Sequence, residues 1–247
     1  YSSRRQRQMC IRDRICILKE AKKSISLEIN ESKATSIELF RAIPSTLLDN
    51  KTFSMFADTP KYRRKILDRC LMASDKNYSK DFFSFHRSLK QRNAALKFKR
   101  LTNIDMWSEI FIHSGTLISE KRNNFFEETK QTFFRFTKNL KDKRVLEIIN
   151  SLEILFHKGW ASQHSLKEVL ELNRDSDQRK TSTTSGPHRA DIKFLIKDSD
   201  IKYILSRGEQ KFMSILWCLS MHKTLSDVYG VKPFLIIDDI HSELDED

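Results

Sequence analysis

The stretch 203-YILSRGEQKFMSILWCL-219 joins a short apolar segment to the beginning of an amphipathic helix. Ser206 and Glu209 have the spacing of a capping box, in which each side chain bonds the backbone N–H of the other residue. The free N–H groups at a helix N-terminus also bind anions, and Gly208 would let the backbone approach a phosphate closely. The stretch therefore predicts either an ordinary helix start or half of a phosphate site. The helix that follows would be buried along Phe212, Ile215, Leu216 and Leu219.

The segment 234-FLIIDDI-240 favours the phosphate interpretation. Its four apolar residues predict a buried strand, and α/β sheets bind ligands at the carboxyl ends of their strands. Asp238 and Asp239 follow the apolar run and point to opposite faces, so they need different partners. Asp238 suits a Mg²⁺ ligand, and Asp239 suits a general base or water-orienting group beside a phosphate. The alternative is a pair of solvated acids at a strand end.

The composition is that of a globular chain of 247 residues, with 39% hydrophobic and 32% charged residues. Five glycines and four prolines are too few for a loop-rich all-β fold and favour much helix. No apolar run approaches the roughly 20 residues of a membrane span, and no signal-peptide pattern is present. The four cysteines form no C-x-x-C pair. We therefore expect neither a disulfide framework nor a zinc site, and a reducing cytoplasm fits.

The positive charge is concentrated in one block of the sequence. The formal net charge is +12, and residues 61–100 hold 13 Lys and Arg against three Asp and no Glu. Such a block suits a polyanion, most often nucleic acid. The alternative is a solvated helix face.

The same block begins a strongly helical region. Residues 61–99 contain no Gly or Pro, and a second helical pattern covers about 104–141. Together they predict a long antiparallel helical hairpin whose phenylalanines pack in the core. Shorter elements flank it. Strands are expected at 24–29, 152–160, 188–196 and 201–205, with a turn at 197–200, and helices at 35–43, 165–180 and from 206 to about Ser226.

Both ends of the chain are unusual. Residues 1–14 carry five Arg and one Asp and resemble translated sequencing-adapter sequence. We expect residues 1–14 to be a non-native artefact and the native sequence to begin near Ile15. The segment 241-HSELDED-247 ends without a helix or a cap, as an internal fragment of a longer protein would.

The order of the C-terminal motifs resembles the tail of an SMC-like ABC ATPase. LSRGEQ is similar to the signature motif, FLIIDD is similar to Walker B, and a D-loop would contain Ser242, Leu244 and Asp245. Three further motifs, 59-TPKYRRKILD-68, 88-SLKQRNAALK-97 and 185-SGPHRAD-191, make the chain similar to the RecF family from about Ile15 to Asp247.

This resemblance implies an α/β fold: a partial ABC-type (SMC-like) ATPase head with an inserted helical arm. Residues 15–60 would be the remainder of ATPase lobe I, residues 61–141 the arm (lobe II), and residues 142–247 the C-terminal part of the ATPase lobe. The chain departs from the family pattern at Glu209 of the signature, with little expected effect. The larger departure is that it has no G-x-x-x-x-G-K-[ST] loop to cradle phosphates. The switch-loop segment that follows the D-loop in the family is missing too.

The resemblance also implies roles for individual residues. The signature would contact ATP held by a partner protomer, and the D-loop would lie beside it. Asp238 would hold Mg²⁺ and Asp239 would be catalytic. The signature residues are Ser206, Arg207, Gly208, Glu209 and Gln210, and the D-loop residues are Ser242 and Asp245. Without its own phosphate loop, the chain alone is expected to bind ATP poorly and to hydrolyse none.

For the intact protein, the resemblance implies a weak DNA-dependent ATPase of gap repair in the cytoplasm, linked to replication, recombination and the SOS response. It would form an ATP-dependent homodimer, bind double-stranded DNA beside single-stranded gaps, and load RecA with RecO and RecR. The candidate DNA contacts on the arm are Arg63, Arg64, Lys65, Lys90 and Arg92. Part of this set could instead form ion pairs with Asp68 one helical turn away.

Other interpretations stay open. The chain could be another SMC-like repair ATPase, of the zinc-hook or overcoming-lysogenization type, although it lacks a long heptad pattern and a C-x-x-C hook. It could also be a non-catalytic helical DNA-binding protein, which would bind DNA without responding to ATP. Within 185-SGPHRAD-191, Gly186 and Pro187 suit a turn, and His188 suits a hydrogen-bonded structural role better than a catalytic one.

Overall fold

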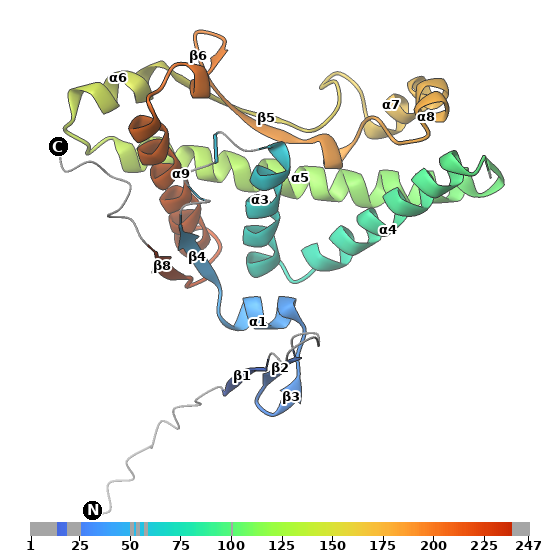
Figure 1. The fold of residues 1–247 in the computed structure, drawn as a ribbon, viewed down its shortest axis with the longest axis horizontal. Helices are drawn as coiled ribbons and strands as arrows, with labels where there is room; N and C mark the ends of the chain where they lie inside the picture. Colours follow the sequence, from blue (N-terminus) through green and yellow to red (C-terminus); the bar gives the residue numbers. More distant parts are fainter. Residues whose placement is uncertain are drawn as a thin grey trace, which may run out of the picture.

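Helices dominate the structure, and three small sheets lie against or beside them (Figure 1). The computed structural model describes residues 14–18, 26–49, 52, 55–56, 59–99 and 101–238. The strands are β1 (Ile15–Leu18), β2 (Ser26–Ile29), β3 (Ser32–Lys33), β4 (Ser45–Leu48), β5 (Leu152–His157), β6 (Asp191–Ile196), β7 (Ser199–Asp200) and β8 (Phe234–Ile237). The α-helices are α1 (Ser36–Ala42), α3 (Pro60–Ser74), α4 (Tyr78–Lys97), α5 (Ile104–Thr137), α6 (Lys143–Ser151), α7 (Leu166–Leu172), α8 (Arg174–Lys180) and α9 (Arg207–Asp227). Three short 3₁₀ helices are η1 (Leu101–Asn103), η2 (Pro187–Arg189) and η3 (Ile201–Tyr203).

The predicted helical arm is present, but its first half is not one helix. The chain breaks at Asp75, so that α3 and α4 replace the single helix expected over 61–99. The backbone N–H of Asn77 donates to the Asp75 side chain at 2.7 Å, a local bond that competes with helix continuation. The helix α5 then runs for 34 residues antiparallel to α4, beside it in Figure 1.

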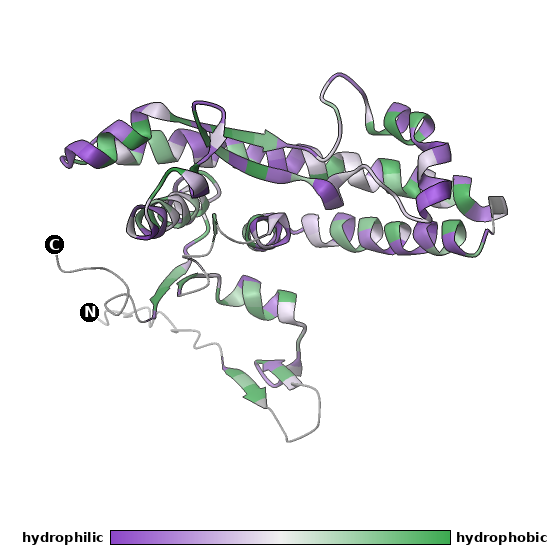
Figure 2. Cartoon of the chain, turned by 45° about the horizontal axis from the view of Figure 1, so that its top comes forward, coloured by the Kyte–Doolittle hydropathy of each residue, from purple (hydrophilic) through white to green (hydrophobic). Residues whose placement is uncertain are grey.

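Hydrophobic residues recur along α4 and α5 between hydrophilic ones, as Figure 2 shows. This spacing puts the phenylalanines of the arm on its inner side, where Phe85, Phe111, Phe125, Phe126 and Phe133 are no more than 1% exposed. The prediction that these aromatic residues form the core is confirmed.

The core continues from the arm into the C-terminal part. Strands β5, β6 and β7 form an antiparallel sheet in which Ile154 pairs with Phe194. The ring centroid of Trp217 on α9 lies 5.1 Å from that of Phe194 and 5.7 Å from that of Phe133 on α5. A single apolar core therefore joins α5, α9 and this sheet.

Other predicted elements differ in length, type or continuity. The strands expected over 152–160 and 188–196 are the shorter β5 and β6. The segment 201–205 is not a strand, because η3 occupies its first three residues and the strand β7 precedes it at Ser199–Asp200. The expected turn before it is confined to Lys197 and Asp198, both at positive φ. The helix expected over 165–180 is divided at Asn173 into α7 and α8.

Strand β8 is confirmed as a strand, but its predicted burial is wrong for this chain. It pairs in parallel with β4, and Leu47 lies opposite Ile236. Phe234, Leu235, Ile236 and Ile237 are 62%, 41%, 48% and 56% exposed. Apolar strands of parallel sheets are normally covered on both faces. In the described part of the chain β4 is the one strand beside β8, so its apolar side chains face solvent.

Candidate functional site

The N-terminus of α9 carries the predicted capping box. The Ser206 hydroxyl accepts the backbone N–H of Glu209 at 3.2 Å, and the Glu209 carboxylate accepts the N–H of Ser206 at 2.8 Å. The Gln210 side chain donates to the carbonyl oxygens of Lys202 and Leu205 at 3.1 and 2.9 Å. These bonds fix the start of the helix against η3, so its N-terminus is held in place before any ligand arrives.

The first residues of this helix start are open to solvent. Ser206, Arg207 and Gly208 are exposed, and nothing in the described structure lies within 4 Å of where a Cβ of Gly208 would be. A large anion can therefore reach the first N–H groups of α9.

Arg144 on α6 holds the signature from the side. Its Nε donates to Glu209 Oε1 at 2.8 Å. Burial alone would raise the pKa of Glu209, but the bonds from Arg144 and Ser206 lower that pKa overall, so the carboxylate stays ionised. The sequence analysis missed Arg144. It lies 65 residues before Glu209, outside every motif, so no local pattern indicates it.

Asp238 follows β8 at the surface. Its backbone N–H donates to the carbonyl oxygen of Leu48 at 2.9 Å, which extends the β4–β8 ladder, and its side chain is exposed. Proteins commonly bind Mg²⁺ through one or two carboxylates, with waters and substrate phosphates as the other ligands. The exposed carboxylate of Asp238 therefore suits the predicted Mg²⁺. Asp239, Ser242 and Asp245 lie outside the described residues, and their roles stay predictions. Among the described residues, no group of three or more His, Cys, Asp and Glu could hold a metal ion.

The signature and the strand that carries Asp238 lie along different parts of α9. His222, late in that helix, is 3.0 Å from Thr46 of β4, and β8 pairs with β4. Figure 1 likewise shows β8 beside the C-terminal half of α9, whereas the helix begins near β6. The helix has 21 residues and is about 30 Å long.

Arg–Asp pairs anchor the three upstream motifs to one another or to neighbouring helices. Arg63 donates to Asp191 at 2.7 and 3.1 Å, and Arg122 donates to Asp68 at 2.7 and 2.9 Å. Arg92 donates to Asp177 at 2.8 Å. These bonds tie α3 to β6, α5 to α3 and α4 to α8.

This network corrects two of the predicted DNA contacts. Arg63 and Arg92 are only 9% and 3% exposed, and their guanidinium groups are already paired, so they stabilise the fold instead of meeting a phosphate. The alternative of a pair between Asp68 and its neighbours Arg63 or Arg64 is also wrong, because Asp68 pairs with Arg122 from α5.

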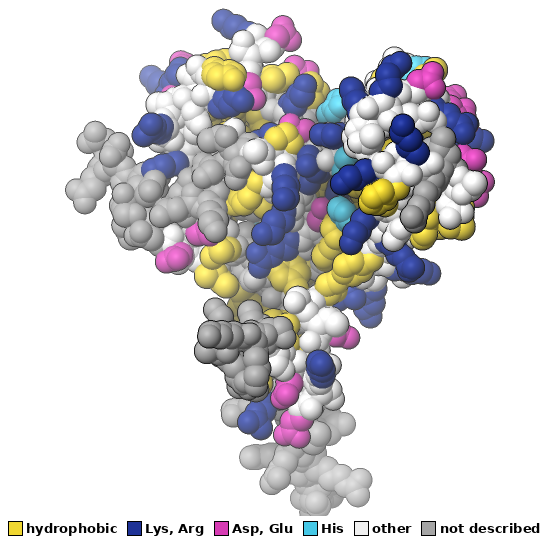
Figure 3. Space-filling view, turned by 45° about the vertical axis from the view of Figure 1, so that its right-hand side comes forward, with side chains coloured by type: hydrophobic (Ala, Val, Ile, Leu, Met, Phe, Trp, Pro, Cys, Tyr) yellow, Lys and Arg dark blue, Asp and Glu magenta, His cyan; other side chains and the backbone are white. Residues whose placement is uncertain are grey.

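The other three candidates remain accessible. Lys65 and Lys90 are exposed, while Arg64 is partly buried and donates to the carbonyl oxygen of Ala190 at 2.6 Å. Figure 3 shows Lys and Arg side chains gathered along the middle of one face, beside His and hydrophobic side chains. These three residues stay predicted DNA contacts.

His188 has the structural environment that its sequence context favours. Its Nε2 lies 3.0 Å from the carbonyl oxygen of Thr183, while its buried Nδ1 has no hydrogen-bond partner in the described structure. Burial lowers the pKa of His188 to about 4, so the ring is neutral at pH 7. Gly186 begins the turn before it at φ 139°, as expected for a turn glycine. Arg189 is exposed.

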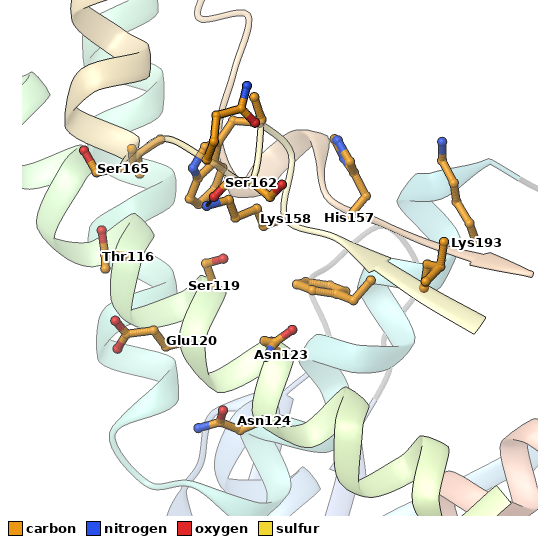
Figure 4. A pocket seen from close by; sticks show the side chains of 16 residues that line it. Thr116, Ser119, Glu120, Asn123, Asn124, His157, Lys158, Ser162, Ser165 and Lys193 are labelled. Carbon is orange, nitrogen blue, oxygen red and sulfur yellow. Dashed lines mark hydrogen bonds between the residues drawn. The ribbon is translucent and has the colours of Figure 1, made fainter. Parts of the chain in front are cut away.

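A cavity of about 830 Å³ lies elsewhere, between α5 and the end of β5 (Figure 4). Ser119, Glu120 and Asn123 on α5 form one wall, and Lys158 and Lys193 belong to the opposite side. It contains none of the signature or Walker B residues, so it is separate from the predicted nucleotide site.

No helix in the described ranges is long and apolar enough to cross a membrane.

Comparisons with known proteins agree on one family. The chain is 34% identical over 215 residues to the DNA replication and repair protein RecF of Pseudoalteromonas translucida, covering 85% of this chain and 57% of that protein. It is 30% identical over 223 residues to RecF of Coxiella burnetii strain CbuG_Q212, covering 89% of this chain and 60% of that protein. A search with protein-family models found no match.

Solved structures agree with these sequences. The recombination mediator protein RecF-ATP of the RecFOR pathway superposes with a TM-score of 0.81 at 27% identity, covering 95% of this chain and 65% of that one. A second RecF structure, named RecF-ATPrS, has a TM-score of 0.80 at 28% identity, covering 94% of this chain and 65% of that one. The predicted fold class, a partial SMC-like ABC ATPase head with a helical arm, is thereby confirmed. The chain spans about three fifths of the curated relatives it matches, and along that length it is similar to RecF.

Proposed function

We propose that this chain is the signature-bearing segment of a RecF-like repair ATPase, which binds DNA and closes on ATP held by another protomer. The observation that carries this proposal is the N-terminus of α9, which is capped and rigid yet open to solvent at Ser206, Arg207 and Gly208.

The chemistry of this helix start supports a phosphate partner. The N–H groups of Arg207 and Gly208 belong to the first turn of α9, where the helix dipole favours negative charge. With no side chain, Gly208 leaves room for phosphate oxygens, and Arg207 adds a positive charge. The ion pair with Arg144 offsets the negative charge of Glu209, which reduces its repulsion of an approaching phosphate.

The position of Asp238 supports a site made from two protomers. The strand that carries it lies beside the C-terminal half of α9, away from the signature in the first turn, so one chain holds the two groups apart. In a head-to-tail dimer, the signature of one protomer would meet ATP held beside Walker B of the other. Asp238 would there bind Mg²⁺, which neutralises phosphate charge, and Asp239 would orient or deprotonate the attacking water. The D-loop residues Ser242 and Asp245 would lie between the two nucleotides.

The basic arm supports the DNA part of the proposal. Lys65 and Lys90, with Arg64 at the edge of the same helical region, can pair with phosphates without breaking a structural ion pair. We propose double-stranded DNA beside a single-stranded gap as the ligand, and RecO and RecR as partners in loading RecA. The protein would act in DNA repair, replication and recombination in the cytoplasm, as part of the SOS response.

A chimera tests the enzyme. The segment matched by this chain would replace its counterpart in RecF of Pseudoalteromonas translucida, which supplies the remaining two fifths. We expect slow ATP hydrolysis that DNA stimulates, and its loss in Asp239→Asn with ATP binding retained. If a folded Asp239→Asn chimera hydrolyses ATP at the unaltered rate, the catalytic assignment is wrong.

A further inference from the structure

A cavity of about 610 Å³ between α1, α3 and α4 has a strong excess of positive charge. Five cationic side chains and one carboxylate line it: Lys61, Arg64, Lys65, Arg69, Arg122 and Asp68. Figure 3 shows Lys and Arg side chains along a hollow on this face, with His and hydrophobic side chains next to them.

The nearby carboxylates do not balance this charge. Asp68 is bound by Arg122, and Asp191 behind the cavity is bound by Arg63. Over the described ranges, Lys61, Arg64, Lys65 and Arg69 form no ion pair. Burial, and then the nearby charge of Arg122, lower the pKa of Arg64, so this cation lies in an environment that an added anion would relieve.

The walls of the cavity are apolar. Ile37 and Phe40 of α1, Met72 of α3 and Phe82 of α4 contribute to its lining. The guanidinium group of Arg69 lies 4.4 Å from the centre of the Phe40 ring, which orients this arginine at the rim. The volume of the cavity is in the range of pockets that enclose a small molecule or a few side chains.

We propose that this cavity docks an acidic peptide segment of a partner protein. An aromatic or aliphatic side chain of the peptide would lie among Phe40, Met72 and Phe82. The carboxylates of the peptide would pair with Arg64, Lys65 and Arg69, so the peptide would compete with the proposed DNA ligand for Arg64 and Lys65. Clusters of Arg commonly recognise acidic motifs in this way, because the planar guanidinium binds a carboxylate through two hydrogen bonds.

A nucleotide fits the same cavity less well. The edge of a base carries several hydrogen-bonding groups, and each group that is buried without a partner costs about 1–3 kcal/mol. Apart from the charged groups, Ser36 and His86, the lining is apolar at Ile37, Phe40, Met72 and Phe82, and the Nδ1 of His188 is a buried polar atom without a partner in the described structure. Charge complementarity together with apolar walls therefore favours a peptide.

Fluorescence anisotropy of the 247-residue chain tests the proposal, with fluorescein-labelled Asp-Asp-Phe-Leu-Asp-Asp as the probe. A second peptide has Ala in place of Phe and Leu at equal charge, and oligo(dT) competes in a parallel titration. The variants are Arg69→Glu and Phe40→Ala. Lys167→Glu, exposed on α7, is the matched charge control, and circular dichroism checks that each variant is folded.

We expect saturable binding that weakens by about tenfold or more in Arg69→Glu and in Phe40→Ala but not in Lys167→Glu. The Ala peptide should bind at least about tenfold more weakly than the probe. Equal binding of both peptides would reduce the cavity to a non-specific basic surface and overturn the proposal. Binding of oligo(dT) at the Arg69 rim with no binding of the probe would make it a nucleic-acid site, and no binding of either would also overturn it.

Discussion

Arg122 of α5 donates two hydrogen bonds to the carboxylate of Asp68 in α3, across 2.7 and 2.9 Å, and a third to the carbonyl oxygen of Pro187 at 2.7 Å. Both residues are buried, and Tyr78 also donates to Asp68. Burial alone would lower the pKa of Arg122, but Asp68 and Tyr78 raise it overall. Arg122 therefore links three parts of the fold: the motif at residues 59–68, the long helix α5 and the turn at residues 186–189.

Removing one partner of this pair should destabilise the fold strongly. In Arg122→Met or Asp68→Leu, the remaining charge is buried without compensation, which lowers the free energy of unfolding by about 3–5 kcal/mol. Because the two residues share one interaction, the double variant should cost less than the sum of the singles. Urea denaturation measures all three. Arg144→Met is the control, because its ion pair with Glu209 is open to solvent and should contribute far less to stability. Additive losses would show that the pair is not coupled.

Two glycines should respond in opposite ways to alanine. Gly159 has φ 101°, and a Cβ there would lie 2.1 Å from the carbonyl oxygen of Gly186, so Gly159→Ala should lower stability by more than about 1 kcal/mol. Gly208 is helical with open space around it, so Gly208→Ala should preserve or raise the thermal midpoint. In the chimera, however, Gly208→Ala should weaken ATP-dependent closure by crowding the phosphate approach. A stable Gly159→Ala protein would contradict the turn geometry.

His188 should make the protein less stable in mild acid. Its ordinary pKa of 6.5 applies to the unfolded chain, whereas burial lowers the pKa to about 4 in the fold. Between these values the unfolded state binds a proton that the folded state does not. The stability that His188 contributes is therefore complete above about pH 6.5 and is lost as the pH falls towards 4. Urea midpoints at pH 7 and pH 5 should differ less in His188→Gln than in the original chain, and an unchanged difference would rule out this role.

DNA binding should separate the accessible basic residues from the buried ones. Each of Lys65→Glu and Lys90→Glu should reduce the slope of log K against log salt by about 1, because one phosphate contact is lost. Arg92→Met should instead lower the unfolding midpoint, since it breaks the pair with Asp177. Anisotropy with a gapped duplex at several salt concentrations measures the slopes, and Lys167→Glu is the surface control. A smaller salt slope in a folded Arg92→Met protein would return this residue to the DNA surface.

The sequence predicts what depends on local pattern. The capping box at Ser206 and Glu209, the arm helices and the β8 strand follow from spacing and periodicity alone. Contacts between distant segments do not follow from local pattern. Arg63 looks like a DNA contact in the sequence because its partner Asp191 lies 128 residues away. The break at Asp75 depends on one side-chain bond that competes with the helix, which periodicity does not register. The exposure of Ile236 depends on which strands lie beside β8, and this is a property of the assembled sheet.

The most direct test of the two-protomer site is nucleotide-dependent dimerisation of the chimera, measured by light scattering with Mg²⁺ and a slowly hydrolysed ATP analogue. Ser206→Arg would block the open N-terminus of α9, and Ser226→Arg places the same side chain on an exposed position in the last turn of that helix. We predict that Ser206→Arg binds nucleotide normally but stays monomeric, while Ser226→Arg dimerises like the unaltered chimera. If Ser206→Arg dimerises normally, or loses nucleotide binding in the monomer, the signature does not act on the nucleotide of a partner and the account is wrong.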